Sequence, residues 1–540
     1  MRLIAAAALA AVSLATLAQA QAPAQPDFTA DAFRAHVEFL ADDLLEGRDT
    51  GTRGYDIAAK YVATRFESLG LKPGAGTSWY QQVPFALANL SGEAPRVTIG
   101  GRVFTHGQQV IVGPTALEAS QNVEAPVMFV GYGLDSPANG FDDYRGLDVR
   151  GKIVAVLSGA PTGTPSEMAA HLNAEKARMA EARGAIGVVT IPTRADAERR
   201  PWARRVELSK GPAMNWIRAD GRAFSRAPGI RVGATLDTAA AEALFAGSRR
   251  PLSAILDEAA RDGGKPKGFA LQPAMRIERQ SEITRISSPN VLAVLPGSDP
   301  ALAGEYILLM AHLDHEGVDP DLPGDKIYNG AMDNATGTAT LLEVARAMIE
   351  SGTRPKRSIL FAAVTAEEDG LLGSEYLARN PVVGNGKVVG VVNLDMPVLL
   401  YDFQDVIAFG ADHSTLGPIV ARAVAQANVK LSPDPLPQEN LFTRSDHYRF
   451  VQAGVPSVFL MTGFAGEGAK QFTDFLATHY HKVSDAPTLP IDWAAGAKFA
   501  RINYLIAREI ADAPQAPRWY ADSFFGKAVG GSQPRATRAR

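Results

Sequence analysis

The feature that most constrains the fold is a regular alternation of apolar runs and helical patterns after about Asn290. Short runs rich in Ile, Val and Leu occur at Ile307–Met310, Ile359–Val364, Val388–Val392 and Ser457–Leu460. Between these runs, apolar residues recur at helical spacing. Strands that alternate with helices form a parallel sheet that the helices cover on both faces. The sequence therefore predicts a mixed α/β fold with a mostly parallel sheet flanked by helices.

The stretch between about Val97 and Val232 has a different pattern. Its apolar runs are short and β-rich, Gly, Pro and Asp separate them, and a helix is expected at about Ala174 to Arg183. Such a mixture is typical of a separate α+β domain inserted into the first fold. The tail from Ala513 is rich in Pro, Gly and Arg, and we expect its last stretch to be loose. We expect a signal peptide at 1–20, a main domain at 27–95 and 281–512, an inserted domain at 96–280 and a tail at 513–540.

The first twenty residues have the pattern of a secretion signal. Arg2 supplies a positive charge, Leu3–Leu17 is apolar apart from Ser and Thr, and Ala18-Gln19-Ala20 has small residues where a signal peptidase reads. A membrane anchor is the alternative, but the run is short for a span and a Pro-containing segment follows it. We therefore expect cleavage after Ala20 and export to the periplasm or the medium, without a membrane anchor.

Composition narrows the possible partners and cofactors. The chain has 54 Lys and Arg against 58 Asp and Glu, a formal charge of −4, so no basic surplus points to nucleic acid as a partner. The chain has no cysteine, which excludes disulfides, thiolate metal sites and a cysteine nucleophile. Histidine and carboxylate side chains then remain as the ligand set for a zinc ion.

Histidine and acidic residues follow the predicted strands of the main domain. His312 and Asp314 come after the first apolar run, Glu367 and Glu368 after the second, and Asp395 after the third. The carboxyl ends of parallel strands share one sheet edge, where open α/β sheets bind ligands. Carboxylates that lie close together repel one another unless a cation or protons lie among them. This edge is therefore a predicted metal site.

Two further residues join this set. Asp333 lies in a Gly-rich loop, and His481 comes late in the chain. Five ligands fit two metal ions that share one carboxylate and keep open positions for water and substrate. The adjacent Glu367 and Glu368 suit a division of labour in which one binds metal and the other moves a proton. Asp314 can accept the N–H of the imidazole two residues before it.

The chain resembles the co-catalytic zinc exopeptidases, a family that includes secreted bacterial aminopeptidases and glutamate carboxypeptidase. The motifs stand in the family's order and cover nearly the whole mature chain. They are Ala311–Asp314, Gly330–Gly337, Thr365–Ser374, Asn393–Met396, Arg444–His447 and Tyr480-His481 with Asp485. The segments Gly131–Gly133, Asp143-Tyr144 and Gly151–Val154 resemble a protease-associated domain, which such enzymes often carry as an insertion. The resemblance implies the zinc exopeptidase fold, with the main domain as the catalytic one.

The resemblance also implies a ligand for each position of a two-zinc centre. His312 and Asp395 would complete one zinc site, and Glu368 and His481 would complete the other. Asp333 would bridge the two Zn²⁺ ions.

The remaining roles follow in the same way from the resemblance. Glu367 would be the general base, and the carboxylate of Asp314 would accept the N–H of His312 and so orient its ring. Tyr480 would donate a hydrogen bond to the tetrahedral oxyanion, and Arg444 would contact the substrate.

One segment departs from the family pattern. The stretch Gly463–Thr478 is longer than the family's compact loop before the last histidine, which leaves the pocket rim undefined. His479 therefore competes with His481 as the metal ligand, and the Asp four residues after His481 favours His481.

The expected function is an exported zinc metallopeptidase that hydrolyses N-terminal residues from short peptides through a metal-activated water and a Glu base. A carboxypeptidase or an N-acyl amino-acid hydrolase on the same two-zinc site is the main alternative. A single-zinc acyltransferase similar to glutaminyl cyclase is a weaker one, as is a non-catalytic binding protein such as the transferrin receptor. The complete ligand set together with Glu367 disfavours both of these.

Overall fold

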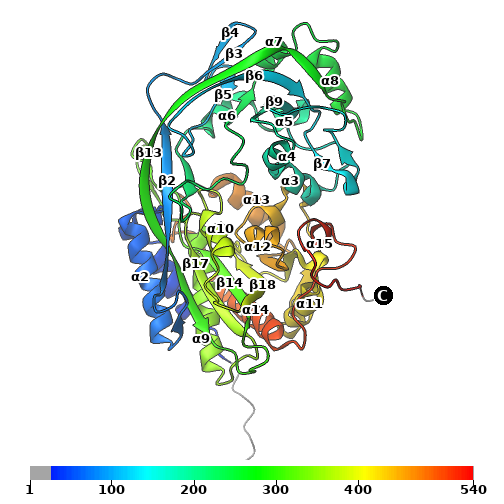
Figure 1. Cartoon of the computed structure of the whole chain (residues 1–540). Helices are drawn as coiled ribbons and strands as arrows, with labels where there is room; N and C mark the ends of the chain where they lie inside the picture. Colours follow the sequence, from blue (N-terminus) through cyan, green and yellow to red (C-terminus); the bar gives the residue numbers. More distant parts are fainter. Residues whose placement is uncertain (1–25, 539–540) are drawn as a thin grey trace, which may run out of the picture.

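The structure is a computed structural model that describes residues 26–538, so the predicted signal peptide at 1–20 lies outside the described residues. Two lobes are visible in Figure 1, with the N-terminal helices in the lower lobe and most of the first 280 residues' β-structure in the upper lobe. We call the lower one the main lobe and the upper one the inserted lobe. Within residues 26–538, no helix combines the length and the apolarity that crossing a bilayer requires.

The main lobe is built on a mixed sheet. The four apolar runs form strands that pair in parallel in the spatial order β17, β14, β18 and β21. Antiparallel strands flank this parallel centre. In spatial order the strands are β11 (Ala213–Trp216), β2 (Tyr80–Leu90), β13 (Phe269–Leu295), β17 (Ser358–Val364), β14 (Glu305–His312), β18 (Lys387–Leu394), β21 (Ser457–Thr462), β19 (Asp405–Phe409) and β20 (Lys430–Ser432). The predicted mostly parallel α/β sheet is confirmed.

Helices cover both faces of this sheet, as the continuous apolar runs require. Along β14, Ile307 and Leu309 belong to one buried cluster, whereas Leu308 and Met310 belong to another on the opposite face. Successive strand residues point to opposite faces, so both clusters depend on the same run. The first face carries α1 (Ala30–Leu40), α2 (Arg53–Ser68), α9 (Thr336–Glu350), α11 (Leu416–Gln426) and α14 (Trp493–Asp512), and the second carries α10 (Leu372–Arg379) and α12 (His447–Gln452).

The inserted lobe has a separate apolar core, which runs from Val97 to Ile277. The expected boundaries at 96 and 280 fall at the start of its first strand and in the middle of β13. Its strands are, in spatial order, β4 (Arg102–Thr105), β3 (Arg96–Ile99), β13, β6 (Ser120–Phe129), β9 (Ile153–Leu157), β10 (Gly187–Ile191), β12 (Val232–Leu236) and β5 (Val110–Ile111). Its helices are α3 (Ser166–Ala174), α4 (Lys176–Ala182), α5 (Arg194–Arg199), α6 (Trp202–Glu207), α7 (Thr238–Leu244) and α8 (Leu252–Ala259).

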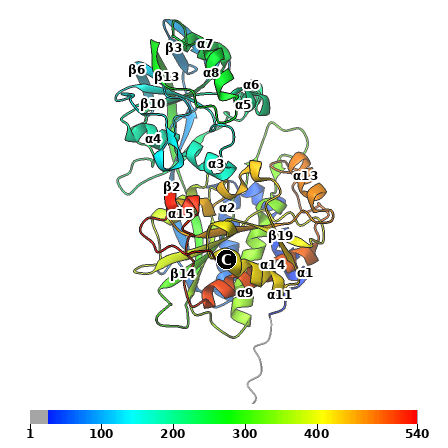
Figure 2. The same ribbon diagram turned by 90° about the vertical axis from the view of Figure 1, so that its right-hand side faces the viewer.

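Three elements connect the lobes, and one of them is β11, which lies within residues 96–280 but pairs with β2 in the main sheet. Strand β13 is 27 residues long and pairs first in the inserted sheet and then in the main sheet, as the long green arrow in Figure 1 shows. Helix α3 makes the third connection and lies at the lower side of the inserted lobe in Figure 2. His171 Nδ1 lies 2.7 Å from the hydroxyl of Tyr448, and His413 Nε2 lies 2.7 Å from Glu167 Oε2. The inserted lobe is therefore fixed to the main lobe on two sides.

The C-terminal segment begins with a part that packs on the main lobe. Trp519 is 1% exposed, and its ring N–H donates to the carbonyl of Gly454 over 2.7 Å. Helix α15 (Phe524–Ala528) buries Phe525 against the main lobe. The first part of the tail therefore belongs to the core through two large aromatic side chains, whereas residues 531–534 of its last stretch are exposed.

Candidate metal centre

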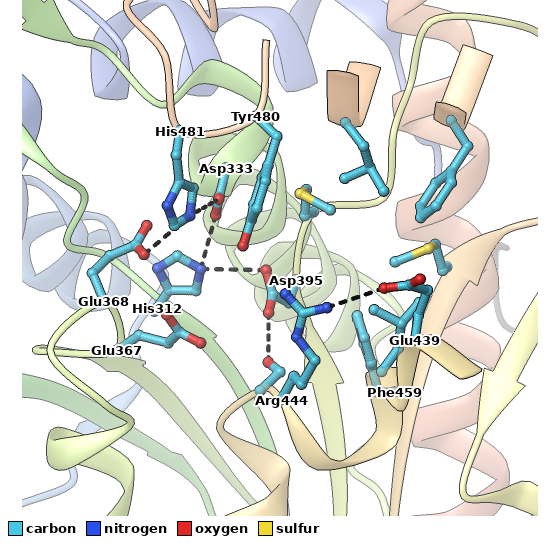
Figure 3. Close-up of a pocket in the computed structure, with 16 residues that line it drawn as sticks. His312, Asp333, Glu367, Glu368, Asp395, Glu439, Arg444, Phe459, Tyr480 and His481 are labelled. Atoms are coloured by element: carbon cyan, nitrogen blue, oxygen red, sulfur yellow. Dashed lines mark hydrogen bonds and ion pairs between the residues drawn. The ribbon is translucent and has the colours of Figure 1, made fainter. Parts of the chain in front are cut away.

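Six of the predicted site residues meet at the carboxyl edge of the main sheet (Figure 3). Strand β14 ends in one of them, two follow β17 after a gap of two residues, and one follows β18 directly. The remaining two come from the turn before α9 and from the loop after α13 (Gly468–Thr478). Together they line a cavity of about 210 Å³. They are His312, Asp333, Glu367, Glu368, Asp395 and His481.

Asp333 lies between the two histidines. Its Oδ1 is 3.2 Å from His312 Nε2, and its Oδ2 is 3.3 Å from His481 Nε2. Burial alone would raise the pKa of Asp333, but hydrogen bonds with His312 and His481 outweigh it and hold the pKa well below its usual value. Each carboxylate oxygen therefore faces a different histidine, as expected for a carboxylate shared by two metal ions.

One half of the centre, which we call the His312 half, consists of His312, Asp395 and Asp333 Oδ1. His312 Nε2 lies 3.3 Å from Asp395 Oδ1. The second oxygen of Asp395 accepts a hydrogen bond from the hydroxyl of Ser445. His312 Nδ1 donates to the main-chain carbonyl of Asp314 over 3.2 Å, which leaves Nε2 directed at the carboxylates.

The other half, the His481 half, consists of His481, Glu368 and Asp333 Oδ2. His481 Nε2 lies 3.2 Å from Glu368 Oε2. The second oxygen of Glu368 accepts from Nδ1 of His315 over 2.7 Å. His481 Nδ1 lies 2.9 Å from Glu316 Oε1, so this half too has its imidazole turned with Nε2 toward the carboxylates.

These distances fit a metal centre. Ligand atoms at about 2.0–2.2 Å from a tetrahedral zinc ion lie roughly 3.3–3.6 Å from one another. The four contacts between imidazole and carboxylate atoms measure 3.2–3.3 Å. Four acidic side chains around two imidazoles also leave an excess of negative charge, which cations would neutralise. The residues present therefore fit zinc ions as ligands.

Glu367 lies beside both halves without being tied to either by a hydrogen bond in the described structure. One of its oxygens lies in a group with donor atoms of His312 and Asp395 that are within 4.8 Å of one another. Burial raises the pKa of Glu367 well above its usual value, the charge of His312 lowers it, and that of Glu368 raises it further. A carboxyl group in this environment binds a proton readily, as a general base requires.

The position of the Asp314 carboxylate differs from the expectation. The main-chain carbonyl of Asp314, and not its side chain, accepts the N–H of His312. The carboxylate is fully buried and accepts from the main-chain N–H of Glu368 over 3.2 Å instead. Burial also raises its pKa well above the usual value. The prediction that this carboxylate contacts His312 was wrong, because the chain turns after β14 so that the carbonyl faces the ring.

Tyr480 and Arg444 both line the cavity. The Tyr480 ring packs on His481, with 3.9 Å between ring centroids, and burial raises the pKa of its hydroxyl, which keeps the proton on it. The Arg444 side chain is 51% exposed and its Nη1 lies 3.7 Å from Glu439 Oε2. His479, the competitor of His481, is not among the lining residues, and its Nδ1 contacts the hydroxyl of Ser484 at 2.9 Å.

Sequence reasoning left several neighbours of the site without a role. His315 and Glu316 continue the predicted His312 motif, so their position in the sequence was a usable signal. Asp485 was recognised only as a marker of His481, yet its carboxylate accepts the main-chain N–H groups of Met332 and Asp333 at 2.8 and 2.9 Å. Glu439 lies 42 residues or more from every predicted metal ligand, and no motif indicated it.

Comparison with known proteins agrees with this geometry. Residues 290–507 match peptidase family M28. A protein of Pyrenophora teres f. teres named "Probable zinc metalloprotease" is 37% identical over 112 residues, 21% of this chain and 23% of that protein. A "Probable glutamate carboxypeptidase" of Arabidopsis thaliana is 25% identical over 369 residues, 63% of this chain and 47% of that protein. The chain thus spans about a quarter to a half of the length of these relatives.

A solved structure shares the fold of both lobes. The aminopeptidase from Aneurinibacillus sp. strain AM-1 superimposes with a TM-score of 0.50 at 19% identity and covers 91% of this chain and 95% of its own. Because the identity is this low, the match supports the fold and nothing about substrates.

Proposed function

We propose that this chain, whose residues 290–507 form a peptidase family M28 domain, is a two-zinc aminopeptidase that removes N-terminal residues from short peptides. The observation that carries the proposal is the position of Asp333, whose two oxygens face His312 and His481. The His312 half and the His481 half each offer one imidazole, one carboxylate and one oxygen of Asp333. Zinc ions held by these ligands would acidify a water molecule and polarise the scissile carbonyl.

The side chains of this site supply the proton transfers. Glu367 would take the proton of the attacking water and deliver it to the leaving amine, which its position beside His312 and Asp395 favours. Tyr480 keeps its hydroxyl proton and would donate a hydrogen bond to the oxyanion of the tetrahedral intermediate.

The charge of the cavity favours a free N-terminus over a free C-terminus. Its floor carries the carboxyl groups of Asp333, Glu367, Glu368 and Asp395. Arg444 is the only Lys or Arg among the described residues that line it, and Glu439 lies beside that cation. A free α-amine suits such a floor either as an ammonium group or as a zinc ligand, whereas a substrate carboxylate would be expected to need unpaired cations at the rim. The carboxypeptidase alternative, which the Arabidopsis relative keeps open, lacks this support.

The opposite wall of the cavity is apolar, and this supports a preference for an apolar N-terminal side chain. Burying such a side chain there would remove it from water and strengthen binding. Two of the wall residues lie on α13, which occupies the segment where the sequence departs from the family pattern. The wall consists of Met396, Leu441, Phe459, Met461, Phe472 and Leu476.

The inserted lobe supports a restriction to short peptides. Its helix α3 packs against the two short helices Pro437–Glu439 and Leu441–Thr443, which carry lining residues of the cavity. A lobe that contacts the cavity rim in this way limits how far a folded protein can enter.

Hydrolysis of matched substrates tests this function. We expect the purified protein to release p-nitroaniline from leucine p-nitroanilide faster than from the glutamate compound, to lose activity to a chelator, and to leave N-acetyl-leucine p-nitroanilide intact. Glu367→Gln protein is the control for contaminating peptidases. Equal cleavage of the blocked substrate, with release of residues from the C-terminus of peptides, would favour the carboxypeptidase alternative.

We also propose that the protein is exported after removal of residues 1–20. The support is the charged and apolar pattern that ends at Ala18-Gln19-Ala20. Mass spectrometry of the protein from the periplasm or medium of an expressing bacterium should give a mature chain that starts at Gln21. An intact chain found only in the cytoplasm would contradict this.

A further inference from the structure

In both halves of the centre, the ligands make the same kinds of contacts with groups outside the ligand set, which we call outer contacts. In each half, Nδ1 of the histidine donates to an oxygen outside the ligand set. In each half, the carboxylate turns one oxygen toward the histidine and gives the other to an outer hydrogen-bond donor. Each histidine and each carboxylate is therefore oriented by a contact with a group outside the ligand set.

The outer partners of the His481 half are two consecutive side chains. His315 Nδ1 donates to Glu368 Oε1 over 2.7 Å, and Glu316 Oε1 lies 2.9 Å from His481 Nδ1 as an ion pair. In the His312 half the corresponding groups are a main-chain carbonyl and the hydroxyl of Ser445. The turn after β14 thus contacts Glu368 and His481, the two ligands of the His481 half that are not shared with the His312 half.

The ring of His315 is tightly packed and has one side-chain hydrogen-bond partner among residues 26–538. The residue is 1% exposed, and a Cβ added at Gly330 would come within 2.6 Å of the ring, so the chain packs tightly against it. Its Nε2 finds no hydrogen-bond partner among residues 26–538. The contact with Glu368 is therefore the ring's one side-chain hydrogen bond in that part of the chain, and a histidine that served the fold alone would be expected to satisfy both nitrogens.

The contact of Glu316 has a different consequence. A carboxylate accepts only, so the 2.9 Å contact places a proton on His481 Nδ1 and leaves the Nε2 lone pair free when the ring is neutral. His481 itself is 33% exposed and lies in a loop, so packing alone fixes its ring less than it fixes His312, which is 1% exposed. Packing holds the ring of His481 less firmly than that of His312, and His481 is the histidine with a charged partner, Glu316, outside the ligand set.

We propose that His315 and Glu316 are positioning residues that set the affinity of the His481 half for its zinc ion, without acting on the His312 half. The inference rests on the two-zinc centre of the proposed function. Glu368 and His481 would sample several rotamers without these partners, and zinc binding would then have to order them. Loss of such outer partners typically lowers metal affinity about 10–100-fold.

Zinc binding by the metal-free full-length protein tests the inference directly. Zn²⁺ is titrated in competition with a chromophoric chelator, and the wild type is expected to bind two equivalents. Glu316→Ala and His315→Ala should each weaken one equivalent about 10–100-fold and leave the other unchanged. Glu316→Gln keeps an acceptor oxygen, and His315→Asn keeps an N–H near the place of Nδ1. Both variants should therefore lose less zinc affinity than the corresponding alanine variants. The Asn variant also keeps the test valid if His315→Ala fails to fold.

Two matched controls assign the weakened equivalent. Ser445→Ala removes the corresponding donor of the His312 half and should weaken the other equivalent instead. In a His481→Ala background, which abolishes the His481 half, adding Glu316→Ala should change nothing, whereas adding Ser445→Ala should still weaken zinc binding. Melting temperatures of the metal-free variants separate a local effect from unfolding.

The outcomes distinguish this inference from the proposed function. Two equivalents of unchanged affinity in Glu316→Ala and His315→Asn would overturn the inference and leave the function standing. Equal weakening of both equivalents, together with a lower melting temperature, would also overturn it, because the residues would then serve the fold alone. Fewer than two equivalents in the wild type would overturn both.

Discussion

The His312 half and the His481 half follow the same plan of contacts but take their ligands from different kinds of structure. His312 and Asp395 stand at the ends of two neighbouring parallel strands, β14 and β18, and the imidazole is 1% exposed. His481 comes from a loop after α13 and is 33% exposed. The ends of two strands orient the first pair of ligands, with the Ser445 hydroxyl on Asp395, whereas in the second pair both Glu368 and His481 contact ionisable side chains. A symmetric reaction centre can thus be built on an asymmetric scaffold.

The shared ligand shows how the two halves are joined. Asp333 lies in the turn before α9, where its main-chain N–H donates to Asp485 over 2.9 Å. Because Asp485 follows His481 by four residues, the same loop supplies a ligand and fixes the bridge. Substitutions can therefore act on both halves together or on one half alone.

The largest effect is expected from Asp333→Ala, which removes a ligand of both halves. We expect loss of both zinc equivalents and turnover at the level of the metal-free protein. Zinc analysis and hydrolysis of leucine p-nitroanilide check this, with the exposed Asp402→Asn as a control. A variant that kept one equivalent at wild-type affinity would mean that the halves do not share this carboxylate.

Glu367→Gln should separate chemistry from metal binding. The amide keeps the size of the side chain but cannot take a proton, so kcat should fall roughly 10²–10⁴-fold while both equivalents stay bound. Zinc analysis beside steady-state kinetics makes the measurement. If zinc is lost as well, Glu367 is a ligand, and the roles of Glu367 and Glu368 are reversed.

Asp485→Ala should weaken both halves together. The main-chain N–H groups of Met332 and Asp333 would lose their acceptor, and the bridging carboxylate would lose its fixed position. We expect both zinc affinities to fall about 10–100-fold in a chelator competition. Weakening of one equivalent alone would show that Asp485 supports one half and not the bridge.

The smallest effect is expected at the rim, away from both halves. Arg444→Ala should lower kcat/KM about tenfold, because one charge-assisted hydrogen bond to the substrate is lost from a half-exposed side chain. Zinc content and melting temperature should not change. Glu439→Gln, which removes the partner of Arg444, is the matched control and should leave kcat/KM the same or higher. A fall in zinc content in Arg444→Ala would place this residue in the metal centre instead.

The sequence predicts the sheet and the ligands better than it predicts their surroundings, for a physical reason. An apolar run such as Ile359–Val364 must be buried on both faces, so its structure follows from its composition. Residues that follow such runs meet at one edge, which is why His312, Glu368 and Asp395 were recognisable. Each side chain at such an edge can point in only a few directions, and the structure brings these three side chains to one cavity.

Outer contacts escape such reasoning because they depend on the path of the main chain. The spacing of His312 and Asp314 is compatible with a contact through the carboxylate or through the carbonyl, and only the turn after β14 decides between them. His315 and Glu316 are ordinary polar neighbours until that turn directs one at Glu368 and the other at His481.

The most direct test of the account is anomalous X-ray diffraction from crystals of the zinc-loaded protein, measured on both sides of the zinc absorption edge. The account predicts two zinc peaks, one bound by His312 and Asp395 and the other by Glu368 and His481, with Asp333 bound to both. A single peak, or a second peak bound by residues outside this set, would contradict it.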